Sequence, residues 1–238
     1  MSAVDDCLRD LIVANRILAN EQVLDAYGHV SVRHPERPDR FFRSCSRAPE
    51  LVVRDDLMEY DLDCNPIDQQ GRMMVAERPI HGAVYAARPD VMAVVHNHAH
   101  ELIPFSVTEV KLRPIFHMAA SLGREVPVWD IRDRFGDTDM LVRSMDQGLD
   151  LARTLGPRRV ALMRGHGSVV AAASMREAVV TSVYLMVNAR MQDRAMAYGA
   201  IKFLSDGEID KMFHAIMAPT SINRAWEYWA RRCGALDL

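Results

Sequence analysis

Apolar residues in the first twenty positions recur at intervals of three and four, the spacing that places side chains on one face of a helix. Val4, Leu8 and Leu11 follow this spacing, so the pattern predicts an amphipathic helix over residues 4–20. Residues 26–33 change to alternation after a glycine, which predicts a turn that leads into a strand.

Both spacings recur along the rest of the chain. Helical spacing predicts a helix that begins at Pro79, a second one capped within residues 137–139 and ended by Gly156, a long one from Ser174 to about Gly199, and two in the tail, from Glu208 and over residues 221–233. Short apolar runs predict strands within residues 93–98, 125–130, 160–163 and 168–172.

Two histidines end the first of these apolar runs. Side chains repeat with a period of two along a strand, so His96 and His98 project from the same face. Two neutral imidazoles side by side at the end of a buried strand supply half of a metal site.

A third histidine lies between two glycines, directly after the run 160–163. Glycine lets the backbone turn sharply and approach a ligand closely, so His166 can reach a shared site. We expect His96, His98 and His166 to bind one divalent cation. The alternative is that they are ordinary surface or core histidines, as most isolated histidines are.

Two further segments carry polar side chains of possible function. Residues 41–49 place arginines and serines in a strand and loop ended by a proline, where Arg47 and Ser46 could bind a carboxylate. A solvated loop is the alternative. Glu77 precedes the helix that begins at Pro79, where the helix dipole favours a carboxylate, and it is either a first-turn acid or a metal ligand or general base.

Length, charge and cysteine content narrow the possible classes. A chain of 238 residues is expected to form a single domain over residues 1–238. Its net charge of -3 provides no excess of positive charge of the kind that indicates nucleic-acid binding. The four cysteines are scattered, which favours a reducing cytoplasm over a disulfide framework. Acidic residues stand where the apolar core of a signal peptide would lie, and no apolar run approaches the roughly 20 residues of a membrane span.

The order and spacing of these motifs resemble the class II aldolase and adducin head-domain family. In that family a glutamate, a His-x-His strand and a late Gly-His-Gly loop build a metal site. Here Glu77 precedes His96 by nineteen positions (96 − 77), as the family's catalytic glutamate precedes its first histidine, and His96, His98 and His166 match its ligands. The resemblance covers nearly the whole chain. It implies a three-layer α/β/α domain with a central, mainly antiparallel sheet, usually assembled as a homotetramer.

Departures from the family's sugar-phosphate aldolases favour another branch. Those aldolases typically carry an asparagine where this chain has His29, a phosphate loop where it has Arg43 to Ala48, and a serine pair where it has Val75-Ala76. A phosphate cradle needs small residues and free backbone N–H groups, and these are lost here. The Ser-x-Ser-Arg-Ala-Pro pattern resembles the decarboxylase branch, which includes 3-hydroxy-2-methylpyridine-4,5-dicarboxylate decarboxylase and the dihydroxyphthalate decarboxylases.

The resemblance therefore implies a metal-dependent carbon–carbon lyase that decarboxylates a hydroxylated aromatic or heteroaromatic mono- or dicarboxylate through a metal-stabilised, enolate-like intermediate. An aldolase for a hydroxy-keto acid or sugar is the first alternative, and a non-catalytic metal-binding assembly module is the second. Mn²⁺ or Zn²⁺ is the expected cofactor, one per subunit, with Fe²⁺ or Co²⁺ also compatible.

The same reading assigns roles to individual side chains. Glu77, or a water bound to the metal, is expected to supply the proton to carbon, and a raised pKa of Glu77 would suit that acid–base role. Arg47 is the expected contact to the substrate's second carboxylate, with Ser46 as a hydrogen-bond partner. His29 is a further expected substrate contact, and Arg224 or His214 is expected to close the site. The helical tail, from about residue 205 to 238, is expected to contribute to a subunit interface or to closure of the active site.

Overall fold

One sheet of seven strands forms the centre of the protein in the computed structural model, which describes residues 2–236. The strand order across the sheet is β3-β2-β1-β4-β7-β6-β5. All neighbouring strands are antiparallel except β5 and β6. The strands are β1 (His29–Arg33), β2 (Arg40–Ser44), β3 (Leu57–Asp61), β4 (Ala93–Asn97), β5 (Val128–Trp129), β6 (Val160–Met163) and β7 (Gly167–Ala172).

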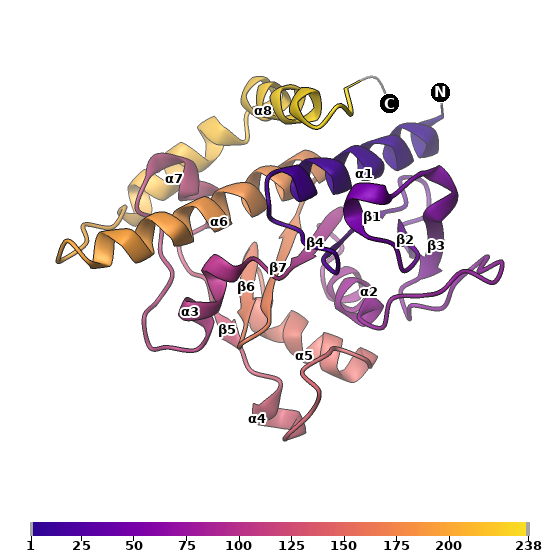
Figure 1. Ribbon diagram of the computed structural model, residues 1–238, viewed down its shortest axis with the longest axis horizontal. Coiled ribbons are helices and arrows are strands. Elements are labelled where there is room, and N and C mark those ends of the chain that lie inside the picture. The colour runs from indigo at the N-terminus through magenta and orange to yellow at the C-terminus, as the bar shows by residue number, and fades with distance from the viewer. Residues whose placement is uncertain (1, 237–238) are drawn as a thin grey trace.

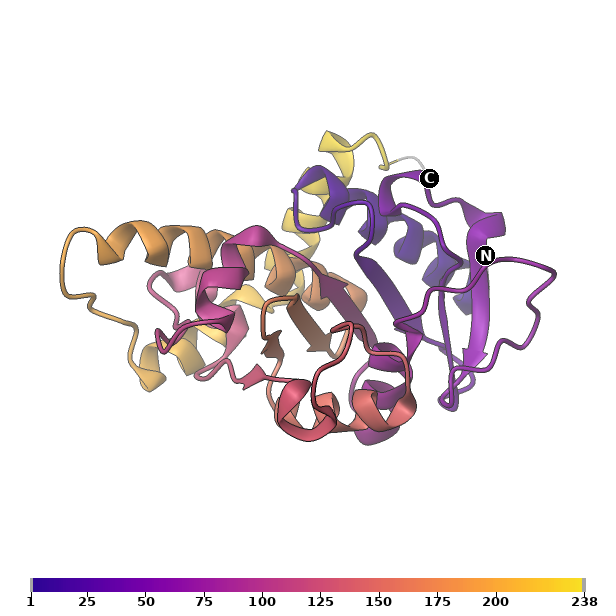
Figure 2. The same ribbon diagram turned by 60° about the horizontal axis from the view of Figure 1, so that its bottom comes forward.

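Helices cover both faces of this sheet, which gives three layers (Figure 1). The helices are α1 (Ala3–Asn20), α2 (Arg78–Ala87), α3 (Ile103–Ser106), α4 (Arg132–Phe135), α5 (Met145–Leu155), α6 (Met175–Met196), α7 (Asp206–Ile216) and α8 (Pro219–Arg232). One apolar cluster joins the sheet to α1, α6 and α8, and a second joins its other face to α2 and α5. The turned view separates the α2 and α5 layer from α1 and α6 (Figure 2). The expected α/β/α class and mainly antiparallel sheet are confirmed.

Local sequence explains where most elements begin. Ser2 caps α1 by accepting the backbone N–H of Asp5 at 3.1 Å. Ser174 caps the long α6 in the same way, by accepting the N–H of Glu177. The helix predicted from Pro79 is α2, and Glu77 occupies its N-cap position as expected.

Two predicted boundaries are wrong. The helix expected to begin within residues 137–139 begins at Met145, because Ser144 and Gln147 form the capping box and Met140 has a positive φ of 66° that helices exclude. The strand expected over residues 125–130 is only Val128–Trp129, the two residues that pair with Leu162 and Met163 of β6.

The tail folds back onto its own chain. Trp226 and Trp229 of α8 are buried in the cluster that includes α1 and α6, which answers the question that the sequence left open about these tryptophans. Among residues 2–236, no helix is both long enough and apolar enough to cross a membrane.

Candidate metal centre

Strand pairing brings the three predicted histidines together. β4 pairs with β7 in the register His96 with Val169 and Asn97 with Ser168, so the residue just before β7 lies beside the end of β4. That residue is His166. The approach requires Gly167, which has a φ of 157° and on which a Cβ atom would lie 1.9 Å from the backbone oxygen of Asn97.

Glu77 joins the histidines from the start of α2. One ligand atom from each of Glu77, His96, His98 and His166 lies within 4.8 Å of the other three. The Nε2 atom of His98 is 3.0 Å from Nε2 of His96 and 3.2 Å from Nε2 of His166. Two imidazole nitrogens bound tetrahedrally to Zn²⁺ lie about 3.3 Å apart, so these separations fit one shared cation.

Hydrogen bonds at the opposite ring atoms orient the histidines. Nδ1 of His96 donates to the backbone oxygen of Ser168, and Nδ1 of His166 donates to that of Met140, both at 3.0 Å. Nδ1 of His98 lies 3.4 Å from the carboxylate of Asp25. Each Nδ1 therefore carries the ring proton, and each Nε2 presents a lone pair to the centre.

Converging lone pairs repel one another unless a cation lies between them. Burial and the neighbouring His96 and His166 lower the pKa of His98 to about 4, so this ring is neutral near pH 7. Three imidazoles and one carboxylate are a donor set that Zn²⁺, Mn²⁺, Fe²⁺ or Co²⁺ accepts. The cluster thus fits a divalent metal and leaves the choice of metal open.

The two carboxylate oxygens of Glu77 have different surroundings. Oε1 accepts the backbone N–H of Val142 at 3.0 Å, whereas Oε2 lies 3.6 Å from Nε2 of both His96 and His166. Burial raises the pKa of Glu77, but positive charge at His166 and His96, or at a cation bound between them, lowers that pKa by more. The raised pKa that would suit a proton carrier is therefore not found, and Glu77 is an anion beside this charge.

A buried hydrogen-bonded chain begins beside the cluster, where the ring of His29 lies 5.0 Å from that of His96. Nδ1 of His29 is 2.7 Å from Nε2 of His81, and Nδ1 of His81 is 2.6 Å from the hydroxyl of Ser31. That hydroxyl is 2.8 Å from the hydroxyl of Tyr85. Burial, aided by the positive charge of Arg43, lowers the pKa values of His29 and His81 well below the usual range, so both rings are neutral.

Next to His29 lies a cavity of about 150 Å³. Its wall includes three of the side chains predicted to bind substrate, His29, Ser46 and Arg47. Ser46 and Arg47 are exposed, and Arg47 lies 3.7 Å from the carboxylate of Asp56. The structure thus brings these three side chains together beside the cluster of possible metal ligands.

Arg43 also lines this cavity. It is one of the two arginines of the segment 41–49 that was expected to bind an anion, although Arg47 was the arginine predicted to contact the substrate. Arg43 is fully buried on β2, at the position paired with Ser31 of β1. Burial lowers its pKa to about 10, so the guanidinium still carries its charge near pH 7. The sequence does indicate that this arginine is buried. Arg43 lies two positions after the apolar Phe41 on the same strand, so both side chains project from the face that packs in the core.

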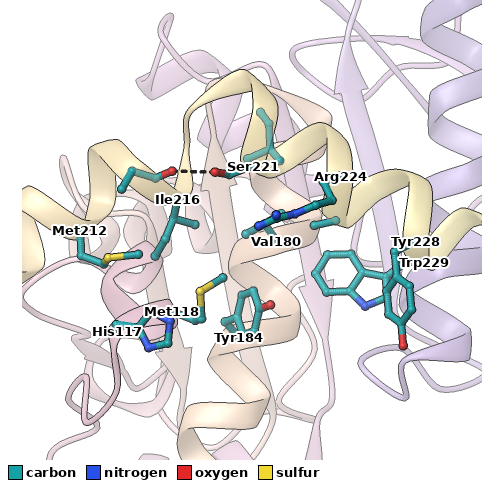
Figure 3. A pocket seen from close by; sticks show the side chains of 13 residues that line it. His117, Met118, Val180, Tyr184, Met212, Ile216, Ser221, Arg224, Tyr228 and Trp229 are labelled. Atoms are coloured by element: carbon teal, nitrogen blue, oxygen red, sulfur yellow. Dashed lines mark hydrogen bonds between the residues drawn. The ribbon is translucent and has the colours of Figure 1, made fainter.

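The other two predicted contacts lie elsewhere in the chain. Arg224 of α8 lines a separate cavity of about 490 Å³, where Figure 3 shows it near Tyr184 and Trp229. His214 is exposed on α7. The 490 Å³ cavity shares no lining residue with the cavity beside the metal cluster, so one chain does not bring Arg224 to the predicted site.

Comparison with known proteins agrees with this architecture. The profile of the class II aldolase and adducin N-terminal domain family matches residues 9–192. "Decarboxylase tropJ" of Talaromyces stipitatus is 36% identical over 94% of this chain and 92% of its own length. The "3,4-dihydroxyphthalate decarboxylase" of Arthrobacter keyseri is 28% identical over 85% of this chain and 84% of its own.

A solved structure shares the fold. The aldolase II superfamily protein from Pseudomonas syringae superposes with a TM-score of 0.80 over 98% of this chain and 94% of its own, at 23% identity.

Proposed function

We propose that this chain, which belongs to the class II aldolase and adducin N-terminal domain family, is a metal-dependent decarboxylase of hydroxylated aromatic or heteroaromatic carboxylates. The observation that carries the proposal is the similarity to a decarboxylase at 36% identity over 94% of the chain. The complete cluster of three histidines and one glutamate supports a catalytic role over an assembly module.

His96, His98 and His166 would bind the cation through their Nε2 atoms, with Glu77 facing it through Oε2. A divalent cation bound there supplies a Lewis acid, which draws electrons toward the substrate's oxygen as the carbon–carbon bond breaks. Mn²⁺ and Zn²⁺ are the proposed metals, one per subunit, and Fe²⁺ and Co²⁺ are compatible with the same donors.

Glu77 would carry the proton that replaces the lost carboxylate. Because its pKa is lowered, Glu77 enters the reaction as a base and accepts the proton of the substrate's hydroxyl group at Oε2. Oε2 then gives that proton to the ring carbon that carries the carboxylate, carbon dioxide leaves, and the electron pair of the broken carbon–carbon bond restores the aromatic ring and the anionic oxygen. The Val142 N–H holds Oε1 throughout, which keeps Oε2 directed at the site.

The cavity with His29, Ser46 and Arg47 in its wall would receive the substrate. Arg224 and His214 would then act from a neighbouring subunit of a homotetramer, in which the tail from about residue 205 contributes to an interface or closes the site. The whole chain, residues 1–238, would work as one domain.

Carbon dioxide release from a panel of hydroxylated benzene and pyridine carboxylates tests the proposal. Metal-stripped protein would be reconstituted separately with Mn²⁺, Zn²⁺, Fe²⁺ and Co²⁺, with unreconstituted protein as the control. Metal-dependent release from at least one acid is the expected result. Retro-aldol cleavage of a hydroxy-keto acid without any release would favour the aldolase, and bound metal with neither reaction would favour the assembly module.

A further inference from the structure

The loop between α4 and α5 contacts two residues of the candidate metal centre. The backbone oxygen of Met140 accepts the Nδ1 hydrogen of His166 at 3.0 Å. Two residues later, the backbone N–H of Val142 donates to Oε1 of Glu77, also at 3.0 Å. His166 directly precedes β7, whereas Glu77 lies at the start of α2. Two backbone groups of one short loop therefore orient side chains from distant parts of the chain.

Met140 adopts a backbone conformation that is unusual for methionine. Its φ is 66°, in the left-handed region that glycine and asparagine tolerate best. Residues stay in such conformations only where the surrounding contacts enforce them, and these residues cluster at functional sites. The carbonyl of Met140 binds His166, and its Cε atom lies only 3.2 Å from where a Cβ atom on Gly165 would be. The conformation of Met140 thus supports the loop that carries His166.

Side-chain oxygens, and not a helix or a strand, shape the segment before α5. Five consecutive backbone N–H groups, those of residues 140–144, each donate to a side-chain oxygen. Thr138 and Asp139 accept the first two, and Gln147 accepts the last two. The middle acceptor is Glu77. A residue of the metal cluster is therefore itself part of the framework that holds this loop.

These contacts link the shape of the loop to metal binding. A cation bound by the cluster would fix both His166 and Glu77, and these two residues hold the backbone at Met140 and Val142. Linkage is reciprocal, so a loop that favours the cation is itself stabilised when the cation binds. The loop is therefore expected to be more ordered in the metal-loaded protein than in the metal-stripped protein.

We propose that residues 138–142, named the positioning loop, set His166 and Glu77 for the cation through the left-handed conformation of Met140. Thr138 is a further positioning residue, because its hydroxyl accepts the N–H of Met140 at 2.9 Å. The proposal rests on the metal binding that the proposed function includes and not on the decarboxylation, so its tests require no substrate.

Zinc affinity of the full-length protein, measured by competition with a chelator, tests the role of Met140. Met140→Val should lower the affinity about 10- to 100-fold, because a β-branched residue avoids a positive φ and the carbonyl then leaves His166. Met140→Gly should keep the affinity, because glycine adopts this φ without strain although it has no side chain. An equal loss in both variants would assign the effect to the methionine side chain and overturn the proposal.

Gln70→Val is the matched control for backbone strain. Gln70 has a φ of 48°, and no hydrogen bond within residues 2–236 joins it to the metal cluster. This variant should unfold at a lower temperature than the unmodified protein and bind zinc with the same affinity. A merely structural role for Met140 predicts the same two results for Met140→Val, and that outcome would overturn the proposal.

Thr138 provides the test that remains if Met140→Val fails to fold. Thr138→Val removes the acceptor of the Met140 N–H and should lower the zinc affinity about 2- to 10-fold, the range that one neutral hydrogen bond covers. Thr138→Ser keeps the hydroxyl and should restore the affinity. Unchanged affinity in Thr138→Val would contradict the proposal.

Amide hydrogen exchange, followed by mass spectrometry, tests the loop in the unmodified protein. Zinc added to metal-stripped protein should slow exchange over residues 140–144, because the cation fixes Glu77, which accepts the N–H of Val142. Exchange over residues 68–72, an exposed loop, should stay the same and serves as the internal comparison. Unchanged exchange over residues 140–144 in protein that binds zinc would overturn the proposal.

His166→Ala separates a failure of the positioning loop from a failure of the metal centre. Zinc affinity that survives in His166→Ala would place the metal elsewhere, and would overturn both the metal centre and the role of the loop. Affinity that is lost in His166→Ala but kept in Met140→Val would overturn the loop alone. The expected losses and rescues, in a protein that decarboxylates no acid, would support the loop and remove the reaction.

Discussion

At the scale of single residues, the two carboxylate oxygens of Glu77 make different contacts. Oε1 is fixed by the N–H of Val142, and Oε2 faces the histidines. A glutamine has the same shape and keeps an oxygen for Val142, but its neutral amide cannot carry a proton to carbon. The substitution therefore separates proton transfer from metal binding.

Glu77→Gln should retain bound metal and lose about 10²- to 10⁴-fold in kcat, the usual contribution of a general acid or base. Metal analysis by mass spectrometry and carbon dioxide release measure the two properties in one preparation. Near-normal turnover in this variant would remove Glu77 as the proton carrier.

Asp25 supports the proposed metal ligand His98, whose Nδ1 lies 3.4 Å from the Asp25 carboxylate. Asp25→Asn should lower metal affinity about 10- to 100-fold, as substitutions of such supporting residues do. Asparagine keeps an oxygen for the N–H groups of Tyr27 and Gly28, so the loop should keep its shape. Competition with a chelator of known affinity measures the change, and an unaltered affinity would show that Asp25 does not support His98.

The site residues that could be predicted from the sequence stand in short motifs, whereas those that could not be predicted have partners far along the chain. His96, His98 and His166 stand in short motifs whose geometry follows from strand parity and glycine. Asp25 and Val142 carry no such motif, because their partners lie far along the chain, 65 positions apart for Val142 and Glu77. Only the folded sheet brings those loops together.

At the scale of elements, the contact between α2 and α5 holds Glu77 in place. Glu77 caps the start of α2, and Val142, which binds it, precedes α5. The two helices touch at Gly148, where a Cβ atom would lie 2.5 Å from the backbone oxygen of Pro79. The hydrogen bond to Glu77 also helps to explain why α5 begins later than predicted. Val142, which lies just before Ser144, donates its N–H to Glu77 instead of continuing the helix.

Gly148→Ala should push the two helices apart and destabilise the protein by about 1–3 kcal/mol, the usual cost of overpacking. Gly207→Ala is the matched control on α7, where a Cβ atom meets nothing within 4 Å, and it should be neutral or slightly stabilising. Urea unfolding measures both. Equal stability of the two variants would contradict the tight contact.

At the scale of the whole molecule, the sheet is held by one apolar cluster on each face, and the candidate metal centre lies where β4 ends and β7 begins. The fold class was predictable because motif order along the chain resembles a family of one architecture. The position of the tail could not be predicted, since an amphipathic helix with tryptophans can pack either on its own domain or on a neighbouring subunit.

Removal of the metal should therefore lower Tm without unfolding the sheet. A ligand at 100 times its Kd stabilises the folded state by about 2.7 kcal/mol, which corresponds to about 5–10 °C for a chain of this size. Differential scanning calorimetry with and without added metal measures the shift. His166→Ala should abolish it, and a shift that survives in that variant would place the metal elsewhere.

The most direct test of the central claim is the rate of carbon dioxide release, from the best hydroxylated acid, as metal is titrated into stripped protein. The account predicts no release without metal, a rise that ends at one equivalent per chain, and no rise in Glu77→Gln. Full release from the stripped protein, or a rise that Glu77→Gln shares, would contradict it.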